Sequence, residues 1–161
     1  MSFIHRLSIL VLFIFCSCTH TQQTPEALQA DHPQKTEPIF HQSHEPKKQD
    51  APFSDIVQVG DLYFLSGQIG MDHSTRTLVE GGIKAETTQT LENIKTVLQQ
   101  HGMDMSNVVK ALVILDDIDD FAAFNAIYRT YLPQKPARTT FAAEALAVGA
   151  KIEIEVIAVK S

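Results

Sequence analysis

The sequence lacks tryptophan, and its only cysteines are Cys16 and Cys18. The chain from residue 19 onward therefore cannot form a disulfide of its own, use a catalytic thiol or supply cysteine ligands to zinc. After residue 44 the only histidines are His73 and His101, which are expected to be ordinary surface or loop residues. The sequence predicts no metal site.

Positive charge is also scarce, with 13 Lys and Arg against 19 Asp and Glu and a formal net charge of −6. Proteins that bind nucleic acid unaided concentrate Lys and Arg against the phosphates. An acidic chain without a basic stretch is not expected to bind nucleic acid, and this also argues against a ribonuclease.

The N-terminus has the parts of an export signal. Arg6 supplies a basic start, residues 7–15 form an apolar run interrupted only by Ser8, and Ser17 and Cys18 follow. The run is too short to span a bilayer core of about 30 Å. We therefore expect residues 1–18 to be a signal peptide.

The end of this signal resembles a bacterial lipobox, in which a cysteine is lipidated and becomes the first mature residue. Cys18 is the expected lipidation site, preceded by the small residue Ser17. Lipid at Cys18 would anchor the protein to a membrane surface without threading it through. The expected location is thus exported, as a periplasmic or membrane-anchored lipoprotein. An ordinary cleaved signal and an uncleaved apolar tail are the alternatives.

Residues 19–51 have the composition of a disordered linker. Gln, Thr, His, Pro, Glu and Lys dominate, and apolar side chains are too sparse to offset the entropy of ordering. His41 and His44 lie in this segment, but a flexible tether does not hold two rings in place for a metal. The folded domain is expected to span residues 52–161.

Within the domain, hydrophobic periodicity predicts an α+β fold with the order β-β-α-β-α-β-β and two helices on one face of a sheet. The expected strands are residues 56–59, 62–66, 108–115, 136–141 and 151–159, and the expected helices are residues 84–100 and a second helix that begins after the aspartates at 116–120 and ends before Pro133. The last strand alternates Ile152, Ile154, Val156 and Ala158 with Glu153, Glu155, Ile157 and Val159. No further helix exists to cover its second, half-apolar face, which predicts oligomerisation.

The last quarter of the chain supplies the candidate chemistry. Arg138 begins one strand and Glu153 lies on the final one. If the two strands are neighbours, the guanidinium could bind a planar anion such as a carboxylate, and the glutamate could hold a water or move a proton. An exposed salt bridge on a sheet face is the alternative. Ser66 and Gly67 begin a glycine-containing stretch that permits close approach of backbone to a ligand.

These pieces, taken in order, resemble the RidA (YjgF) family of reactive intermediate or imine deaminases. The resemblance covers about residues 51–160 and rests on six motifs: P-F-S-D-I-V at 52–57, Y-F-L-S-G-Q-I at 63–69, L-E-N-I-K at 91–95, D-D-F with N-A-I-Y at 119–128, P-A-R-T-T at 136–140 and G-A-K-I-E-I-E at 149–155. Each motif is weak alone, and the ordered set is specific. The resemblance implies a chorismate-mutase-like fold and a homotrimer with ligand clefts between subunits.

The resemblance also implies a reaction and its residues. Family members hydrolyse 2-enamine and 2-imine acids, such as 2-aminoacrylate, to 2-keto acids and ammonia without a cofactor. By position, Arg138 would bind the substrate carboxylate and Glu153 would position the attacking water. The cleft would also contain Thr140, Ser66, Gly67, Phe53 and Asn125.

The chain departs from the family at three positions. Phe53 stands where tyrosine is usual, Thr139 where serine is usual, and Ala147 where proline is usual. Two readings of the function follow. The first is imine hydrolysis through Arg138 and Glu153. The second is a non-catalytic carboxylate-binding or chaperone-like trimer tethered to a membrane.

Overall fold

The computed structural model describes residues 36–160. The expected signal peptide, Cys18 and the first part of the expected linker lie outside this range. The strands of the main sheet are β1 (Ile39–His41), β2 (Ile56–Val59), β3 (Leu62–Ile69), β6 (Val108–Leu115), β7 (Ala137–Ala142) and β8 (Ile152–Val159). A small ribbon comprises β4 (Met71–Asp72) and β5 (Thr77–Leu78), and the two α-helices are α1 (Gly82–Gln100) and α2 (Phe121–Tyr131).

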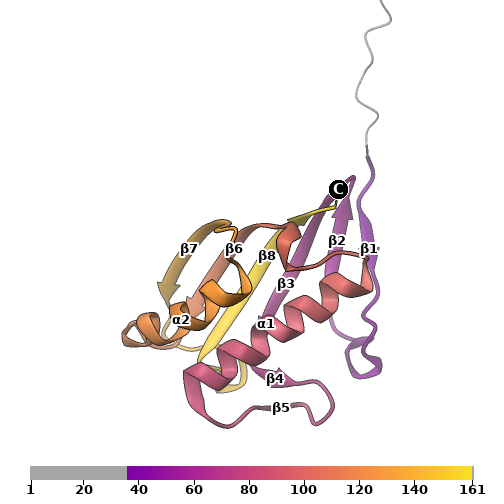
Figure 1. The fold of residues 1–161 in the computed structure, drawn as a ribbon. Coiled ribbons are helices and arrows are strands. Elements are labelled where there is room, and N and C mark those ends of the chain that lie inside the picture. Colours follow the sequence, from indigo (N-terminus) through magenta and orange to yellow (C-terminus); the bar gives the residue numbers. More distant parts are fainter. Residues whose placement is uncertain (1–35, 161) are drawn as a thin grey trace, which may run out of the picture. The chain divides into compact units, whose positions relative to one another are not determined.

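The main sheet has the strand order β1-β2-β3-β8-β6-β7. All neighbours are antiparallel except β6 and β7, which are parallel. A parallel pair needs a crossover connection, and α2 provides it. The final strand β8 therefore lies in the middle of the sheet, whereas β7 lies at one end (Figure 1).

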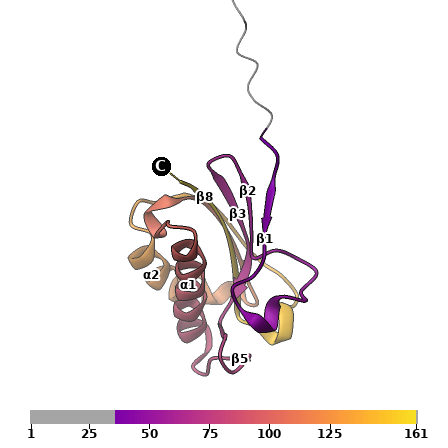
Figure 2. The same ribbon diagram turned by 90° about the vertical axis from the view of Figure 1, so that its right-hand side faces the viewer.

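Both α-helices pack on the same face of the sheet (Figure 2). Leu91, Ile94 and Leu98 recur on one side of α1 and are fully buried, as are Ile152 and Ile154 of β8. Period-3.6 and period-2 apolar patterns that meet in this way form one core. The expected α+β fold with two helices on one face is confirmed.

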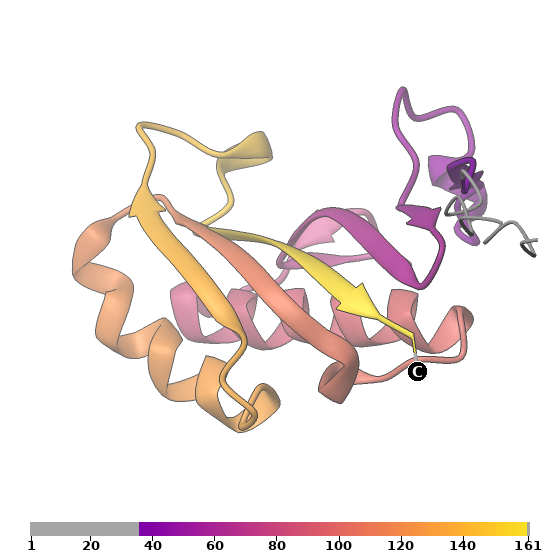
Figure 3. The same cartoon turned by 90° about the horizontal axis from the view of Figure 1, so that it is seen from above.

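The opposite sheet face, here called the open face, is not covered by either α-helix over β7, β6 and β8 (Figure 3). Its apolar residues include Leu62, Phe64, Leu112, Ile114, Phe141, Ile157 and Val159. Leu62, Phe64 and Phe141 are each at least 40% exposed. The open face thus has the half-apolar composition expected from the sequence.

Part of the segment expected to be a disordered linker is ordered. Residues 39–41 form β1, which pairs with β2 in antiparallel register, and Pro46–Lys48 form a short 3-10 helix. Ser43 Oγ also donates a hydrogen bond to the Asp55 carboxylate. The linker prediction fails here because edge pairing and these polar contacts order a segment that has few apolar side chains.

The condition that the arginine strand and the final strand are neighbours is not met, because β6 lies between β7 and β8. The first hairpin and the Val108–Leu115 strand are placed as expected, although β3 continues to Ile69. Within residues 36–160, none of the helices is long and apolar enough to cross a membrane.

Candidate active site

Arg138 lies on the helix-covered side of the sheet. Its register partner on β6 is Ala111, which is fully buried under the helices. Arg138 Nη1 donates a hydrogen bond of 2.8 Å to Asn125 Oδ1 on α2. The amide therefore fixes the direction of the guanidinium.

Three aromatic rings of the second helix also hold this arginine. Its Cζ lies 5.6, 5.3 and 4.7 Å from the ring centroids of Phe121, Phe124 and Tyr128. These distances are within the range of cation–π contacts. The aromatic rings of α2 thus serve both as core and as a platform for a cation.

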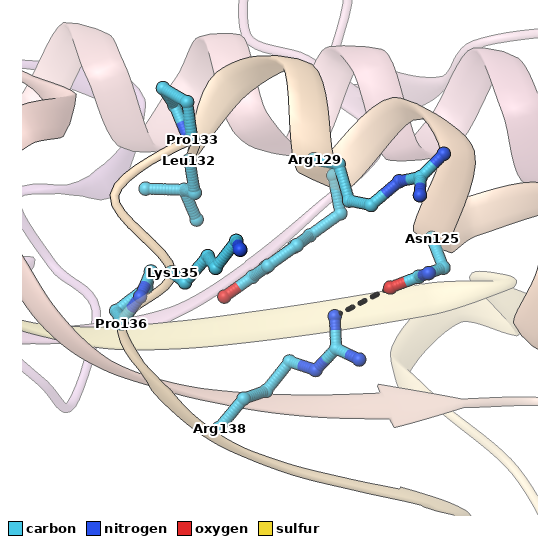
Figure 4. Close-up of a pocket in the computed structure, with 8 residues that line it drawn as sticks. Asn125, Arg129, Leu132, Pro133, Lys135, Pro136 and Arg138 are labelled. Carbon is cyan, nitrogen blue, oxygen red and sulfur yellow. Dashed lines mark hydrogen bonds between the residues drawn. The ribbon is translucent and has the colours of Figure 1, made fainter.

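The guanidinium borders a cavity of about 400 Å³ between α2 and β7, here called the Arg138 pocket. Figure 4 shows Arg138 below α2 with its guanidinium directed toward Asn125. The lining residues are Asn125, Tyr128, Arg129, Leu132, Pro133, Lys135, Pro136 and Arg138.

Thr140 is two residues further along β7, opposite the buried Val113 of β6. Its side chain shares the helix-covered side with Arg138. The buried Thr140 Oγ1 has no hydrogen-bond partner within the described part of the chain, and Thr140 does not line the Arg138 pocket.

Glu153 lies on the open face, where its register partners are Ile69 of β3 and Ile114 of β6. Burial raises the pKa of its carboxyl above the ordinary value, and the neighbouring Glu155 charge raises it further. A carboxyl shifted in this direction is closer to the protonation balance needed to accept and return a proton near neutral pH.

A β-bulge makes room for this carboxylate. Between the pairs Leu65–Val156 and Gln68–Ile154, two residues of β3 oppose a single residue of β8. Gly67 is one of the two. A Cβ there would collide with Glu153 Oε1 and would lie 2.8 Å from Cδ. The absence of a side chain at Gly67 thus allows the carboxylate to lie against the backbone.

Glu153 lines a cavity of about 310 Å³, here called the Glu153 cavity. Its lining residues are Lys48, Phe53, Gly67, Gln68, Ile69, Met71, His73, Arg76, Ala147, Val148 and Glu153. The cavity is thus bordered both by the segment at Lys48 and by the turn at Ala147 and Val148, which are far apart in sequence. In Figure 2 these two segments lie near each other, away from the two α-helices.

The basic groups of this cavity share one acidic partner. Glu45 lies 3.2 Å from Lys48 Nζ, 2.6 Å from His73 Nδ1 and 3.5 Å from Arg76 Nη1. Lys48 also lies 3.4 Å from the Asp55 carboxylate. Burial lowers the pKa of His73, with the Lys48 charge lowering it further. These ion pairs hold residues 45–48 against the other residues that line the cavity.

The other expected cleft residues lie beside Glu153. Phe53 is 56% exposed and lines the Glu153 cavity. Ser66 Oγ donates to the Ser54 carbonyl at 2.7 Å, and Ser66 lines a neighbouring hollow together with Phe53.

The expected site residues therefore form two groups within one chain. Arg138, Asn125 and Thr140 lie on the helix-covered side of the sheet. Glu153, Gly67, Ser66 and Phe53 border the cavities around the open face. One chain does not bring the guanidinium and the carboxylate to a common pocket.

Sequence reasoning missed several lining residues. Tyr128 and Lys135 were not among the expected site residues. Lys48 comes from the segment expected to be a linker, and Arg76 comes from the stretch between an expected strand and an expected helix. The i, i+3, i+7 spacing of Phe121, Phe124 and Tyr128 before an arginine strand was the one available signal for the aromatic platform.

Comparisons with known proteins identify the family of this chain. The family model described as endoribonuclease L-PSP matches residues 43–160. A mouse protein named 2-iminobutanoate/2-iminopropanoate deaminase is 44% identical over 110 residues, which are 68% of this chain and 82% of that protein. The chain belongs to the RidA/YjgF family.

Solved RidA/YjgF structures share the fold. RidA from an Antarctic Psychrobacter species is 34% identical, with a TM-score of 0.66 over 79% of this chain and 99% of that one. The yjgF gene product of E. coli is 31% identical, with a TM-score of 0.66 over 70% of this chain and 91% of that one. The RidA/YjgF match begins at residue 43, inside the segment that the sequence alone assigned to a linker.

Proposed function

We propose that this protein is an imine deaminase that hydrolyses 2-enamine and 2-imine acids to 2-keto acids and ammonia. Family membership and the deaminase name of the mouse relative support the reaction class. The observation that carries the proposal is that the chain presents both a fixed guanidinium and a half-buried carboxyl of raised pKa, on the two sides of one sheet.

The chemistry needs one water and no cofactor. Arg138 holds the substrate carboxylate, which orients the adjacent C=N bond. Glu153 accepts a proton from the water as the oxygen bonds to the imine carbon. It passes this proton to the nitrogen, which gives a carbinolamine. It then moves the hydroxyl proton to the nitrogen as the C–N bond breaks and the C=O bond forms, so the products are a 2-keto acid and ammonia.

The site is formed by two copies of the chain in a homotrimer. Arg138 and Glu153 lie on opposite sides of one sheet, so a single substrate can meet both only if they come from different copies. The half-apolar open face and the end strand β7 are the surfaces that such an assembly would use. Each cleft then combines the Arg138 of one copy with the Glu153 of the next.

The test begins with 2-aminoacrylate generated by a dehydratase and follows pyruvate release. Wild type is expected to accelerate release, whereas Arg138→Ala and Glu153→Gln are expected to lose the acceleration. Retention of ligand binding without any turnover in the wild type would favour the carboxylate-binding alternative. RNA cleavage is not proposed, because a net charge of −6 is unfavourable for binding a polyanion.

A complementation experiment tests the two-copy site. Arg138→Ala and Glu153→Gln chains, each with a different affinity tag, are co-expressed and purified through both tags. In every mixed trimer that passes both tags, one cleft in three contains both wild-type groups, so activity recovers to about one third of the wild-type value. Mixed oligomers with no recovered activity would refute a site shared between copies.

We also propose that the domain is exported and anchored by lipid at Cys18. The sequence of residues 1–18 supports this part of the proposal. Mass spectrometry of the mature N-terminus is the test. A lipid-modified cysteine is expected, and an unmodified chain that begins at Met1 would exclude the anchor.

A further inference from the structure

The Arg138 pocket contains more positive charge than one carboxylate requires. Arg129, Lys135 and Arg138 all line it. Within residues 36–160, none of the three forms an ion pair with a carboxylate. Because the whole chain carries a net charge of −6, this concentration of unpaired cations is a local property of the pocket.

Tyr128 adds a buried hydrogen-bond donor to the same pocket. The residue is 4% exposed, and its hydroxyl proton has no acceptor among the described residues. The Arg138 guanidinium, 4.7 Å from the ring centroid, can donate to the phenolic oxygen but cannot accept the phenolic proton. Burial raises the pKa of Tyr128, so the hydroxyl remains a donor at neutral pH. The phenolic proton therefore lacks an acceptor, which an anionic ligand would supply.

Lys135 is held at the pocket by an unusual backbone conformation. Its φ is 57°, in the left-handed region that residues with a side chain rarely adopt. Lys135 N donates to the Leu132 carbonyl at 3.2 Å, which closes the turn between α2 and β7. Figure 4 shows the Lys135 side chain extending from this turn toward the space between α2 and β7, whereas the Arg129 guanidinium points away from it.

We propose that the Arg138 pocket is built for a substrate with two acidic groups, namely a 2-imino dicarboxylic acid. This inference rests on the proposed function and names its substrate class. Arg138 binds the carboxylate next to the C=N bond, and Lys135 with the Tyr128 hydroxyl binds the second acidic group. A cavity of about 400 Å³ is large enough for a small diacid. Hydrolysis consumes one water and releases ammonia and a 2-keto dicarboxylic acid.

The kinetic test compares two imines that differ in the second acidic group. An amino-acid oxidase of suitable specificity generates the imine of glutamate or the imine of leucine, and the rate of imine loss is followed by semicarbazide trapping. We expect kcat/KM to favour the diacid imine by about tenfold, the effect of one additional charge-assisted contact. Raising the salt concentration is expected to reduce the preference, because Lys135 is exposed to solvent.

Variants assign the preference to named groups. Lys135→Gln is expected to reduce the ratio of the two kcat/KM values to about one, and Tyr128→Phe to reduce it in part. Lys84→Gln makes the same charge change at an exposed position of α1 and is expected to leave the ratio unaltered. A wild type that hydrolyses both imines equally well, or a ratio that Lys135→Gln leaves unchanged, would overturn the inference while leaving the deaminase proposal intact.

Equilibrium binding separates failure of the inference from failure of the proposed function. Calorimetry with 2-oxoglutarate and with 2-oxobutanoate measures the pocket without catalysis. Tighter binding of the diacid that is lost in Lys135→Gln supports the pocket assignment even if no imine is hydrolysed, in which case only the deaminase proposal fails. Equal binding of the two keto acids counts against the assignment whatever the activity.

Discussion

Arg138 Nη1 donates to Asn125 Oδ1 at 2.8 Å, so the acceptor that orients this guanidinium within the described residues is a neutral amide. A neutral partner fixes the direction of the arginine without cancelling its charge. The cation thus stays available to an anion, at a small cost in hydrogen-bond strength compared with a carboxylate partner.

Asn125→Asp tests this relationship. The new carboxylate would form an ion pair with Arg138 and compete with an anionic ligand, so the affinity for a 2-keto acid is expected to fall about tenfold or more. Calorimetric titration measures the effect. Gln99→Glu, an equal charge change at an exposed position of α1, serves as the control and is expected to bind as the wild type does.

Replacement by alanine is expected to have opposite effects at Gly67, within β3, and at Gly70, just after β3. A Cβ at Gly67 would meet the mobile end of the Glu153 side chain, which can move aside. Gly67→Ala is therefore expected to keep the stability within about 1 kcal/mol of wild type while abolishing most of the deaminase activity. Thermal unfolding and pyruvate release measure the two effects. Full activity in Gly67→Ala would show that the position of the carboxylate does not matter.

Gly70→Ala is the matched substitution at a position where the neighbouring atoms belong to a helix and cannot move aside. Its Cβ would lie 2.6 Å from both Cα and Cβ of Glu86 on α1. The buried Glu86 in turn accepts a hydrogen bond from Lys151 N at 2.7 Å, so the helix cannot shift freely. We expect destabilisation of roughly 1–3 kcal/mol or more, seen in urea titration. A Gly70→Ala protein as stable as Gly67→Ala would contradict the packing described.

Glu153 is expected to reduce stability at neutral pH. Its folded-state pKa is raised by burial and by Glu155, so the folded chain binds the proton more tightly than the unfolded chain does. Ionisation above the ordinary value of 4.5 therefore lowers the free energy of unfolding as pH rises through the folded pKa. Glu153→Gln is expected to raise the midpoint of thermal unfolding at pH 7, with the difference disappearing below about pH 4. Glu155→Gln, on the same strand but exposed, should give a smaller difference.

His41 and His44 contact His101 at the end of α1, and this cluster is expected to reduce the stability of the fold in mild acid. The His101 ring lies 4.5 Å from the His41 ring and 5.7 Å from the His44 ring between centroids. Burial, followed by the His41, His44 and Lys160 charges, lowers the pKa of His101 below 6.5. The unfolded chain then binds this proton at a higher pH than the folded chain.

Stability from His101 is thus fully present above about pH 6.5 and is lost as pH falls through the lowered folded pKa. NMR titration of the His101 ring protons should give a pKa below 6.5, and His101→Gln should reduce the drop in unfolding midpoint between pH 7 and pH 5. A His101 pKa at the ordinary value would rule out the histidine cluster as the cause of the loss of stability in acid.

The sequence by itself determined the two α-helices, the five longer strands, the core and the chemical types present. The alternation of Ile152, Ile154 and Val156 with Glu153 and Glu155 set which face of β8 is buried, because side chains of a strand point alternately to its two sides. The spacing of Leu91, Ile94 and Leu98 likewise set the buried side of α1. Such patterns depend on the local geometry of a strand or helix, so they can be recognised without knowing which other elements pack against it.

Only the tertiary structure decided which strands are neighbours and which groups meet. β6 enters between β7 and β8, and this separates Arg138 from Glu153 within one chain. The ordering of β1 and the pairing of Lys48, His73 and Arg76 with Glu45 were equally hidden. Strand order and long-range ion pairs depend on contacts between segments distant in sequence, and no local period encodes them.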